Sequence, residues 1–262
     1  RNNMKTIILI ISILIQYPVF AQAFTEKISK EFSFEKKGAD NALMIVNING
    51  HVTVTGYDGD KILLEVTRTI RAKTADRLEK AKALIKLGVL DRADTIILYT
   101  EGLCSRFGKT SKKTGDWTHR NGWGYNWSER DNDDCKELCD YSFDYIVKVP
   151  RSINLLVSTV NQGNVKIENV SGSIVANNVN GSIALSGISR EASANTINGD
   201  VDITYVKNPQ KPCRFYTLNG DINAWFQKGL AADLSFESFN GELFTNVDHL
   251  ESLPVVVEKK ET

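Results

Sequence analysis

The sequence predicts an all-β protein: a parallel β-helix or β-solenoid with about 18–21 residues per rung, interrupted by an inserted segment that contains one helix. Three observations support this prediction. Asn-Gly pairs recur inside one apolar pattern, the pattern repeats at a spacing of 18 residues, and apolar residues alternate within each half of a repeat. Since one repeat of this size cannot bury its apolar face alone, neighbouring repeats are expected to stack.

The Asn-Gly pairs are expected to form the corners between strands. Glycine adopts positive φ freely, and asparagine does so more readily than most residues. The asparagine side chains should stack into a ladder of amides, with neighbouring rungs about 4.8 Å apart. The corner residues are Asn49, Gly50, Asn180, Gly181, Asn198, Gly199, Asn219, Gly220, Asn240 and Gly241.

Residues 151–250 carry the regular repeats. The last of these repeats lengthen to 21 residues, and the register then resumes with Leu234, Phe236 and Phe239. Side chains at even offsets from a corner glycine should point to the same face of the sheet, which we expect to be buried. The residues predicted to share this face are Leu185, Ile203, Ile222 and Leu243.

Residues 25–57 hold the first strands and a further copy of the repeat pattern, and residues 58–150 form the insertion. Alternating apolar residues predict three strands in the insertion: one from Ile62, one over residues 95–99 and one over residues 141–149, which Pro150 ends.

One helix is expected over residues 74–87 of the insertion. Apolar residues form a stripe at helical spacing between charged residues. Thr74 suits the start of a helix and Gly88 suits its end. The apolar stripe consists of Leu78, Ala81, Leu84 and Ile85.

Residues 1–23 are predicted to be a secretory signal peptide. A short basic region precedes an apolar run over residues 7–15, and Ala21-Gln22-Ala23 offers a small-residue cleavage site. The apolar run is too short to span a membrane. Residues 24–262 are therefore expected to be a single β-solenoid domain that is exported (periplasmic, cell-surface or secreted) and has no membrane span after cleavage.

Composition and motifs exclude several function classes. The formal net charge is zero, which gives no argument for nucleic-acid binding. The sequence lacks the nucleophile elbow, the His-Glu-x-x-His motif, the P-loop and the dinucleotide fingerprint. We therefore expect a protein that is not an enzyme and that holds no cofactor and no metal.

Three acidic residues, Asp200, Asp221 and Glu242, each follow a corner glycine and are expected to lie above one another. Carboxylates at this spacing repel unless a cation lies between them. One interpretation is therefore a calcium ladder. The favoured interpretation is that they are solvated turn residues.

Four cysteines are compatible with export. Cys104, Cys135 and Cys139 lie in the insertion, and a disulfide from Cys104 to either of the others would close the loop between them. A zinc site is the alternative, but no histidine sits at ligand spacing. Cys213 holds an inward position in the repeats and is expected to be a buried free thiol.

The loop over residues 103–140 is the candidate binding element, because it interleaves aromatic residues with glycine and asparagine. In an exported protein, such aromatic rings stack on sugars or anchor a protein partner. Alternatively, the tryptophans pack on one another or cover the end of the solenoid. If the loop binds, removing residues 116–128 should spare the stability of the repeats and abolish binding. The candidate binding residues are Trp117, Trp123, Tyr125 and Trp127.

The units Thr-Ile-Asn-Gly-Asp-Val-Asp-Ile and Thr-Leu-Asn-Gly-Asp-Ile-Asn, with residues 46–60 and 147–153, resemble the bacterial putative-adhesin family of β-strand-repeat envelope proteins, a domain-of-unknown-function group. The resemblance covers about residues 40–247. It implies a non-catalytic exported β-solenoid that acts as an adhesin or as a binding module for a glycan or an envelope protein. The alternative is a glycan-active β-helix enzyme of polysaccharide-lyase type.

Overall fold

The computed structural model describes residues 22–102, 106–109, 123–126 and 139–246. Over these ranges the protein is mostly β-strand with one helix, so the prediction of an all-β fold is confirmed. Residues up to Lys228 form one compact unit, and residues from Gly229 form a second. All the strands and the helix of the described residues lie in the first unit.

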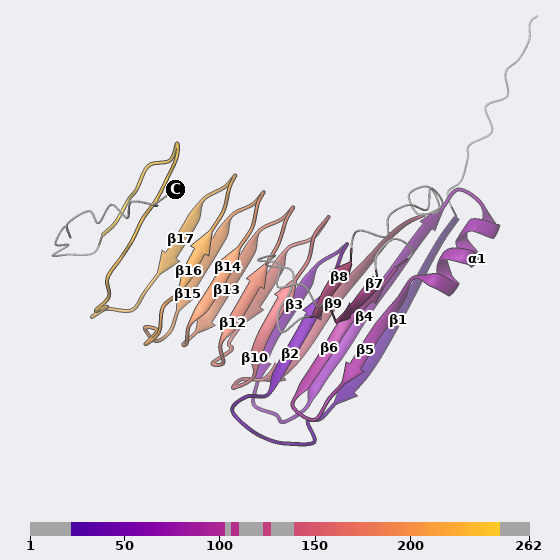
Figure 1. Ribbon diagram of the computed structural model, residues 1–262, viewed down its shortest axis with the longest axis horizontal. Coiled ribbons are helices and arrows are strands. Elements are labelled where there is room, and N and C mark those ends of the chain that lie inside the picture. Colours follow the sequence, from indigo (N-terminus) through magenta and orange to yellow (C-terminus); the bar gives the residue numbers. More distant parts are fainter. Residues whose placement is uncertain (1–21, 103–105, 110–122, 127–138, 247–262) are drawn as a thin grey trace, which may run out of the picture. The chain divides into compact units, whose positions relative to one another are not determined.

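Two large sheets make up the first unit (Figure 1), and a core of buried residues from both sheets lies between them. The eight-stranded sheet has the order β1 (Gln22–Phe32), β4 (Ile62–Ala72), β9 (Asp140–Pro150), β3 (Val52–Tyr57), β11 (Val165–Glu168), β13 (Ile183–Ile188), β15 (Val201–Tyr205) and β17 (Ile222–Trp225). The seven-stranded sheet has the order β16 (Arg214–Tyr216), β14 (Ala192–Asn195), β12 (Ile174–Asn177), β10 (Asn154–Ser158), β2 (Ala42–Val46), β6 (Thr95–Glu101) and β5 (Lys86–Asp91).

Both sheets are mixed. The pairs β1–β4, β4–β9 and β5–β6 are antiparallel, and the remaining pairs of the two large sheets are parallel. The three strands predicted in the insertion are present as β4, β6 and β9. The insertion also supplies β5, which the sequence pattern did not predict.

The parallel ladders follow the predicted repeat spacing. Val165, Ile183, Val201 and Ile222 lie side by side, so successive strands are 18, 18 and 21 residues apart. Val52 joins the same ladder beside Val165. The insertion therefore interrupts the sequence without disturbing the register of the ladder.

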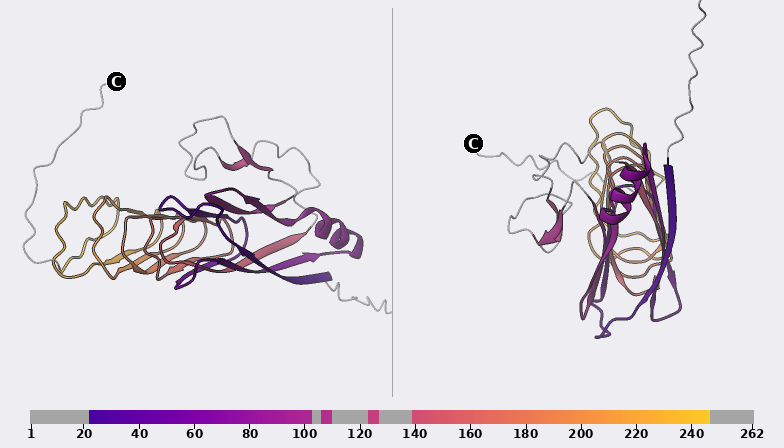
Figure 2. Two further views of the ribbon diagram at one scale, coloured as in Figure 1. Left: turned by 90° about the horizontal axis from the view of Figure 1, so that it is seen from below. Right: turned by 90° about the vertical axis from the view of Figure 1, so that its right-hand side faces the viewer.

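Helix α1 (Ala75–Leu84) begins where predicted and ends early. Its N-cap is Thr74, whose hydroxyl accepts the backbone N–H of Arg77. Leu78 and Ala81 are buried, but Leu84 is 51% exposed. Figure 2 shows the helix at the end of the unit that carries β1 and β4.

The predicted helix stop at Gly88 is wrong, because the chain is already extended at Ile85 and continues into β5. Gly88 instead lies in β5 opposite Tyr99 of β6. A side chain at this position would overlap the Tyr99 ring, which covers the glycine. The glycine therefore serves close packing between strands.

The predicted last repeat is also wrong. Residues 229–246 contain no strand, and Phe239 and Leu243 are 99% and 62% exposed. Ile222 is 44% exposed as well, because β17 is the last strand of its ladder and pairs with β15 alone. In the predicted Asn240-Gly241 corner, the glycine N–H donates to the hydroxyl of Ser238.

The predicted amide ladder is present from Asn161 to Asn219, whereas Asn49 joins it through a backbone bridge to Asn161. The Nδ2 of Asn180 donates to the Oδ1 of Asn161 at 2.9 Å, and the Nδ2 of Asn198 donates to the Oδ1 of Asn180 at 2.8 Å. Asn219 continues the ladder with a bond of 2.7 Å to Asn198. Each side chain therefore fixes the position of the same side chain in the neighbouring rung.

A second column of hydrogen bonds lies inside the corners and was not predicted. Thr159, Asn178 and Thr196 are buried, each two residues before a corner asparagine. Asn178 donates to the carbonyl of Gly163 at 2.9 Å, and Thr196 donates to the carbonyl of Gly181 at 2.8 Å. A buried carbonyl without such a partner would cost about 1–3 kcal/mol.

Close approach between rungs explains the glycine at each corner. Gly199 has φ of 151°, in the region that favours glycine. A Cβ atom on Gly199 would lie 2.5 Å from the carbonyl oxygen of Gly181. Because the obstructing atom belongs to the backbone, it cannot move without separating the rungs.

Replacing Gly199 with alanine is therefore expected to lower the free energy of unfolding by more than about 2 kcal/mol, as measured by urea denaturation. Gly108→Ala is the matched control, because nothing lies within 4 Å of a Cβ atom built there. Equal effects of the two substitutions would refute the close approach.

Leu185 and Ile203 are 1% and 0% exposed, which confirms their predicted burial. Ile203→Asp would place an unpaired charge in the core and is expected to destabilise the protein by more than about 3 kcal/mol. Thr204→Asp, at the exposed neighbouring position, should change stability little. A thermal melt of both variants tests the inward register, which is wrong if both variants melt alike.

Candidate functional site

The described part of the tryptophan-rich loop is a hairpin. Strand β7 (Arg106–Lys109) pairs antiparallel with β8 (Trp123–Asn126). Figure 2 shows this hairpin outside the two large sheets. Its aromatic residues pack against β2 and β6 of the seven-stranded sheet, on the face that points away from the main core.

That outer face of the sheet is apolar where the hairpin lies. In β2, Leu43 and Ile45 point into the main core, whereas Met44 and Val46 belong to a second apolar cluster under the hairpin. A strand that is buried on both faces has consecutive apolar residues. The buried members of the second cluster are Met44, Val46, Ile48, Ile97, Tyr125 and Leu156.

Tyr125 fastens the hairpin to the sheet and is only 3% exposed. Its hydroxyl accepts the backbone N–H of Thr100 at 2.9 Å and lies 2.9 Å from the carbonyl oxygen of Val46. Burial holds the pKa of Tyr125 well above its usual range, so the group stays a neutral phenol. The side chain predicted to bind a partner is thus an internal anchor, and removing residues 116–128 is not expected to spare stability.

The anchor connects with the corners of the repeats. The hydroxyl of Thr100 donates to the Oδ1 of Asn47 at 3.1 Å. The Nδ2 of Asn47 in turn donates to the carbonyls of Gly50 and Phe143, at 3.1 and 2.9 Å. Asn47 and Thr100 are both fully buried. The position of the hairpin is therefore set by the same buried network that holds the first corner.

Three half-buried aromatic rings and one exposed cation form the upper layer of the site. The rings of Tyr99 and Phe107 stack with centroids 4.4 Å apart, and those of Phe107 and Trp123 stack 5.9 Å apart. The guanidinium of Arg92 lies 4.9 Å from the centre of the Trp123 ring. This layer gives the hairpin a stiff aromatic surface.

The remaining loop residues fall outside the described ranges. They include two of the predicted binding residues, Trp117 and Trp127, and the predicted disulfide partners Cys104 and Cys135. Cys139 is half-buried just before β9, and burial raises the pKa of its thiol. The loop disulfide therefore stays a prediction.

Of the three acidic residues predicted to stack, Asp200 has a structural role at its corner. The Oδ1 of Asp200 accepts the backbone N–H of Asp221 at 2.9 Å, and the N–H of Asp200 is accepted by the hydroxyl of Ser182. Ser182 and Asn164 form the same kind of contact one rung earlier. Among the residues that the structure describes, no group of three His, Cys, Asp or Glu could hold a metal ion. The turn interpretation is supported by these contacts.

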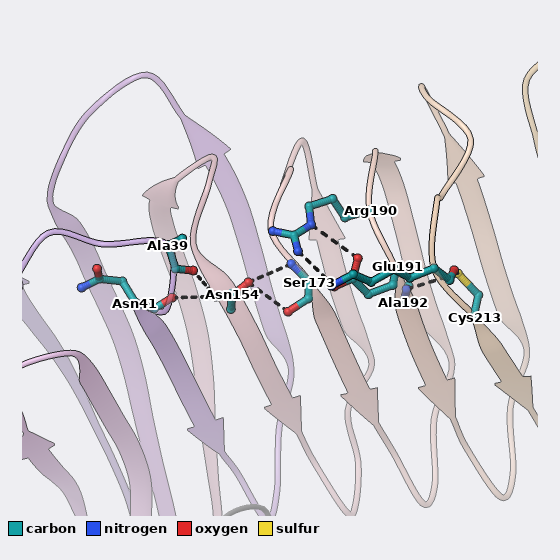
Figure 3. Close-up of polar contacts among 9 residues, drawn as sticks. Ala39, Asn41, Asn154, Ser173, Arg190, Glu191, Ala192 and Cys213 are labelled. Atoms are coloured by element: carbon teal, nitrogen blue, oxygen red, sulfur yellow. Dashed lines mark hydrogen bonds and ion pairs between the residues drawn. The ribbon is translucent and has the colours of Figure 1, made fainter.

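Cys213 lies at the opposite end of the rungs, where the strands of the seven-stranded sheet begin (Figure 3). Its sulfur accepts the backbone N–H of Ala192 at 3.4 Å. Asn154 bridges two rungs in the same way, donating to the carbonyl of Asn41 and accepting the N–H of Ser173. Cys213 is a free thiol in the described structure, as predicted, but it is half-buried and not fully buried.

No family model and no curated protein matches the chain. Two solved structures do. One, described as a putative cell adhesion protein from Clostridium sporogenes, is 9% identical with a TM-score of 0.34, over 78% of this chain and 100% of that one. The other, described as a putative lipid binding protein from Parabacteroides distasonis, is 12% identical with a TM-score of 0.22, over 76% and 96%. TM-scores this low leave function to be argued from the residues themselves.

No helix in the described ranges is long and apolar enough to cross a membrane.

Tyr125→Phe keeps the ring in the second cluster and removes the hydroxyl that accepts the Thr100 N–H. We expect it to lower the free energy of unfolding by about 1–3 kcal/mol in urea denaturation. Tyr57→Phe is the control, because the Tyr57 hydroxyl donates to the carbonyl of Lys61 at the exposed surface. If the two variants are equally stable, Tyr125 is not an anchor.

Proposed function

We propose that the protein is a non-catalytic exported β-solenoid of the bacterial envelope, which uses the tryptophan-rich loop to bind a glycan or a protein partner. The observation that carries this proposal is that the hairpin of β7 and β8 is held against the seven-stranded sheet by Tyr125. Tyr125 is buried at its base, while Trp123 stays half-exposed above it. A loop fastened to a rigid sheet loses little conformational entropy when its aromatic rings bind.

The solenoid part of the proposal is supported by the ladder registers. Parallel pairing at steps of 18 and 21 residues, with stacked corners between the two sheets, is what a coiled chain would produce. Export is supported by the predicted signal peptide. Cleavage after Ala23 would remove Gln22 and Ala23, which pair with Ala72 and Arg71 of β4.

The polysaccharide-lyase alternative has no specific observation in its favour. Such an enzyme needs carboxylates that are available to a substrate on an outer face. Asp200 accepts a backbone N–H, and Asp202 accepts the side-chain amide of Asn223 at 2.9 Å. Both carboxylates therefore already have partners within the repeats.

The test is a binding screen on arrays of glycans and of purified surface proteins. We expect Trp117→Ala combined with Trp127→Ala to weaken the binding found for the parent by at least about tenfold at an unchanged melting temperature. Trp225→Ala is the matched control, since Trp225 lies on β17, outside the loop, and is 53% exposed.

The proposal fails if the double variant binds as the parent does, or if the parent binds nothing on either array. It also fails if soluble oligosaccharides are released from the glycans, because product release would favour the enzyme. Loss of binding in Trp225→Ala alone would indicate that the binding site lies on β17 and not on the loop.

A further inference from the structure

A column of side chains at the corners accepts backbone N–H groups from one rung to the next. The Oδ1 of Asp144 accepts the N–H of His51 at 2.9 Å, and the Nδ1 of His51 accepts the N–H of Asn164 at 3.0 Å. Asn164 then accepts the N–H of Ser182, and Ser182 accepts the N–H of Asp200. Each of these side chains therefore joins two neighbouring strands of the eight-stranded sheet.

His51 occupies the place in this column where the insertion interrupts the sequence. It directly precedes β3, and Asn164 directly precedes β11, so their bond joins the copy of the repeat before the insertion to the regular repeats. His51 also follows Gly50, whose carbonyl accepts the side-chain amide of Asn47. The bond therefore lies at the corner whose buried network also holds the hairpin.

The side chains of the column respond differently to protonation. An imidazole accepts through Nδ1 only while that nitrogen is unprotonated, because the imidazolium has two donors and no acceptor. A carboxyl group such as that of Asp144 keeps an acceptor oxygen when it is protonated, and the side chains of Asn164 and Ser182 stay neutral. Histidine is the side chain that ordinarily gains its charge between about pH 8 and pH 5. Mild acid therefore removes an acceptor from the column at His51.

The charged groups that face His51 from the neighbouring strands have a smaller effect than this lost bond. On the β9 side, the carboxylate of Asp144 attracts an imidazolium. On the β11 side, Lys166 repels it and is itself paired with Glu168 at 3.0 Å. Strand β3 carries no charged residue. Because His51 is exposed, water and salt screen all these charges, whereas a protonated Nδ1 cannot accept the N–H at all.

We propose that His51 makes the junction between the first copy of the repeat and the regular repeats sensitive to acid. At neutral pH, the ring accepts the N–H of Asn164 and the two rungs are joined. When Nδ1 takes up a proton from water, two N–H groups face each other and the ring must turn away. The joined state therefore holds fewer protons than the opened state, so the junction loses stability as the pH falls.

Urea denaturation of the parent and of His51→Asn, at about pH 7.5 and at about pH 5.5, tests this proposal. Asparagine is the residue found one rung later, where Asn164 accepts the N–H of Ser182 at 3.0 Å, so the variant keeps an acceptor at both pH values. We expect the unfolding equilibrium constant of the parent, divided by that of the variant, to rise about three- to tenfold on acidification. His119 and His249 are present in both proteins, so their protonation cancels in this ratio.

A ratio that stays constant within about twofold would overturn the proposal. A ratio that falls would also overturn it, because attraction between the imidazolium and Asp144 would then outweigh the lost bond.

Hydrogen exchange of the parent, followed by NMR, gives a second test that needs no variant. The protection factor of the Asn164 N–H is taken relative to the exchange rate of an unstructured chain at the same pH. Between about pH 7.5 and pH 5.5, it should fall at least about threefold more than that of the Ser182 N–H, whose acceptor does not titrate. Equal changes at the two amides would contradict a role for His51.

Discussion

Hydrogen bonds between stacked corners are the interaction on which the rest of this protein depends. Within a sheet, backbone groups pair with the neighbouring strand, but a corner interrupts the ladder and leaves interior carbonyls without a strand partner. Here buried side chains take that place, as when Thr196 donates to the carbonyl of Gly181. A shift of one residue would bring Ile197 to that position, so the same bonds fix the register.

The hairpin of the tryptophan-rich loop depends on the same network. The side-chain amide of Asn47 donates to the carbonyl of Gly50 at the first corner and accepts a hydrogen bond from the hydroxyl of Thr100. The backbone N–H of Thr100 donates to the hydroxyl of Tyr125. Buried networks of this kind hold one geometry when every member is satisfied. The proposed function follows from this rigidity, because a surface that is fixed in advance binds with a smaller entropic cost.

Features that repeat could be predicted from the sequence, because repetition shows which positions are equivalent. The Asn198 ladder and the inward Ile203 are examples, and both are present. The role of Thr196 could have been predicted by the same reasoning, because a polar residue recurs two positions before most corner asparagines. Apolar runs such as Leu43 to Val46 also signalled a strand covered on both faces.

Features that occur once could not be predicted in this way. The burial of Tyr125 depends on a hairpin packing against a distant sheet face, and the end of α1 depends on β5 pairing with β6. Periodicity carries no information on either contact. The last repeat shows the opposite error, because its pattern continues to Leu243 whereas the last strand in the described residues ends at Trp225. A favourable pattern does not place a segment in a ladder.

Residue-resolved hydrogen exchange by NMR tests most directly whether the corners are held by bonds between rungs. The glycine N–H groups of Gly50, Gly181 and Gly199 should be strongly protected, since each donates to the next rung. Rapid exchange at Gly181 and Gly199 would contradict this account of the fold.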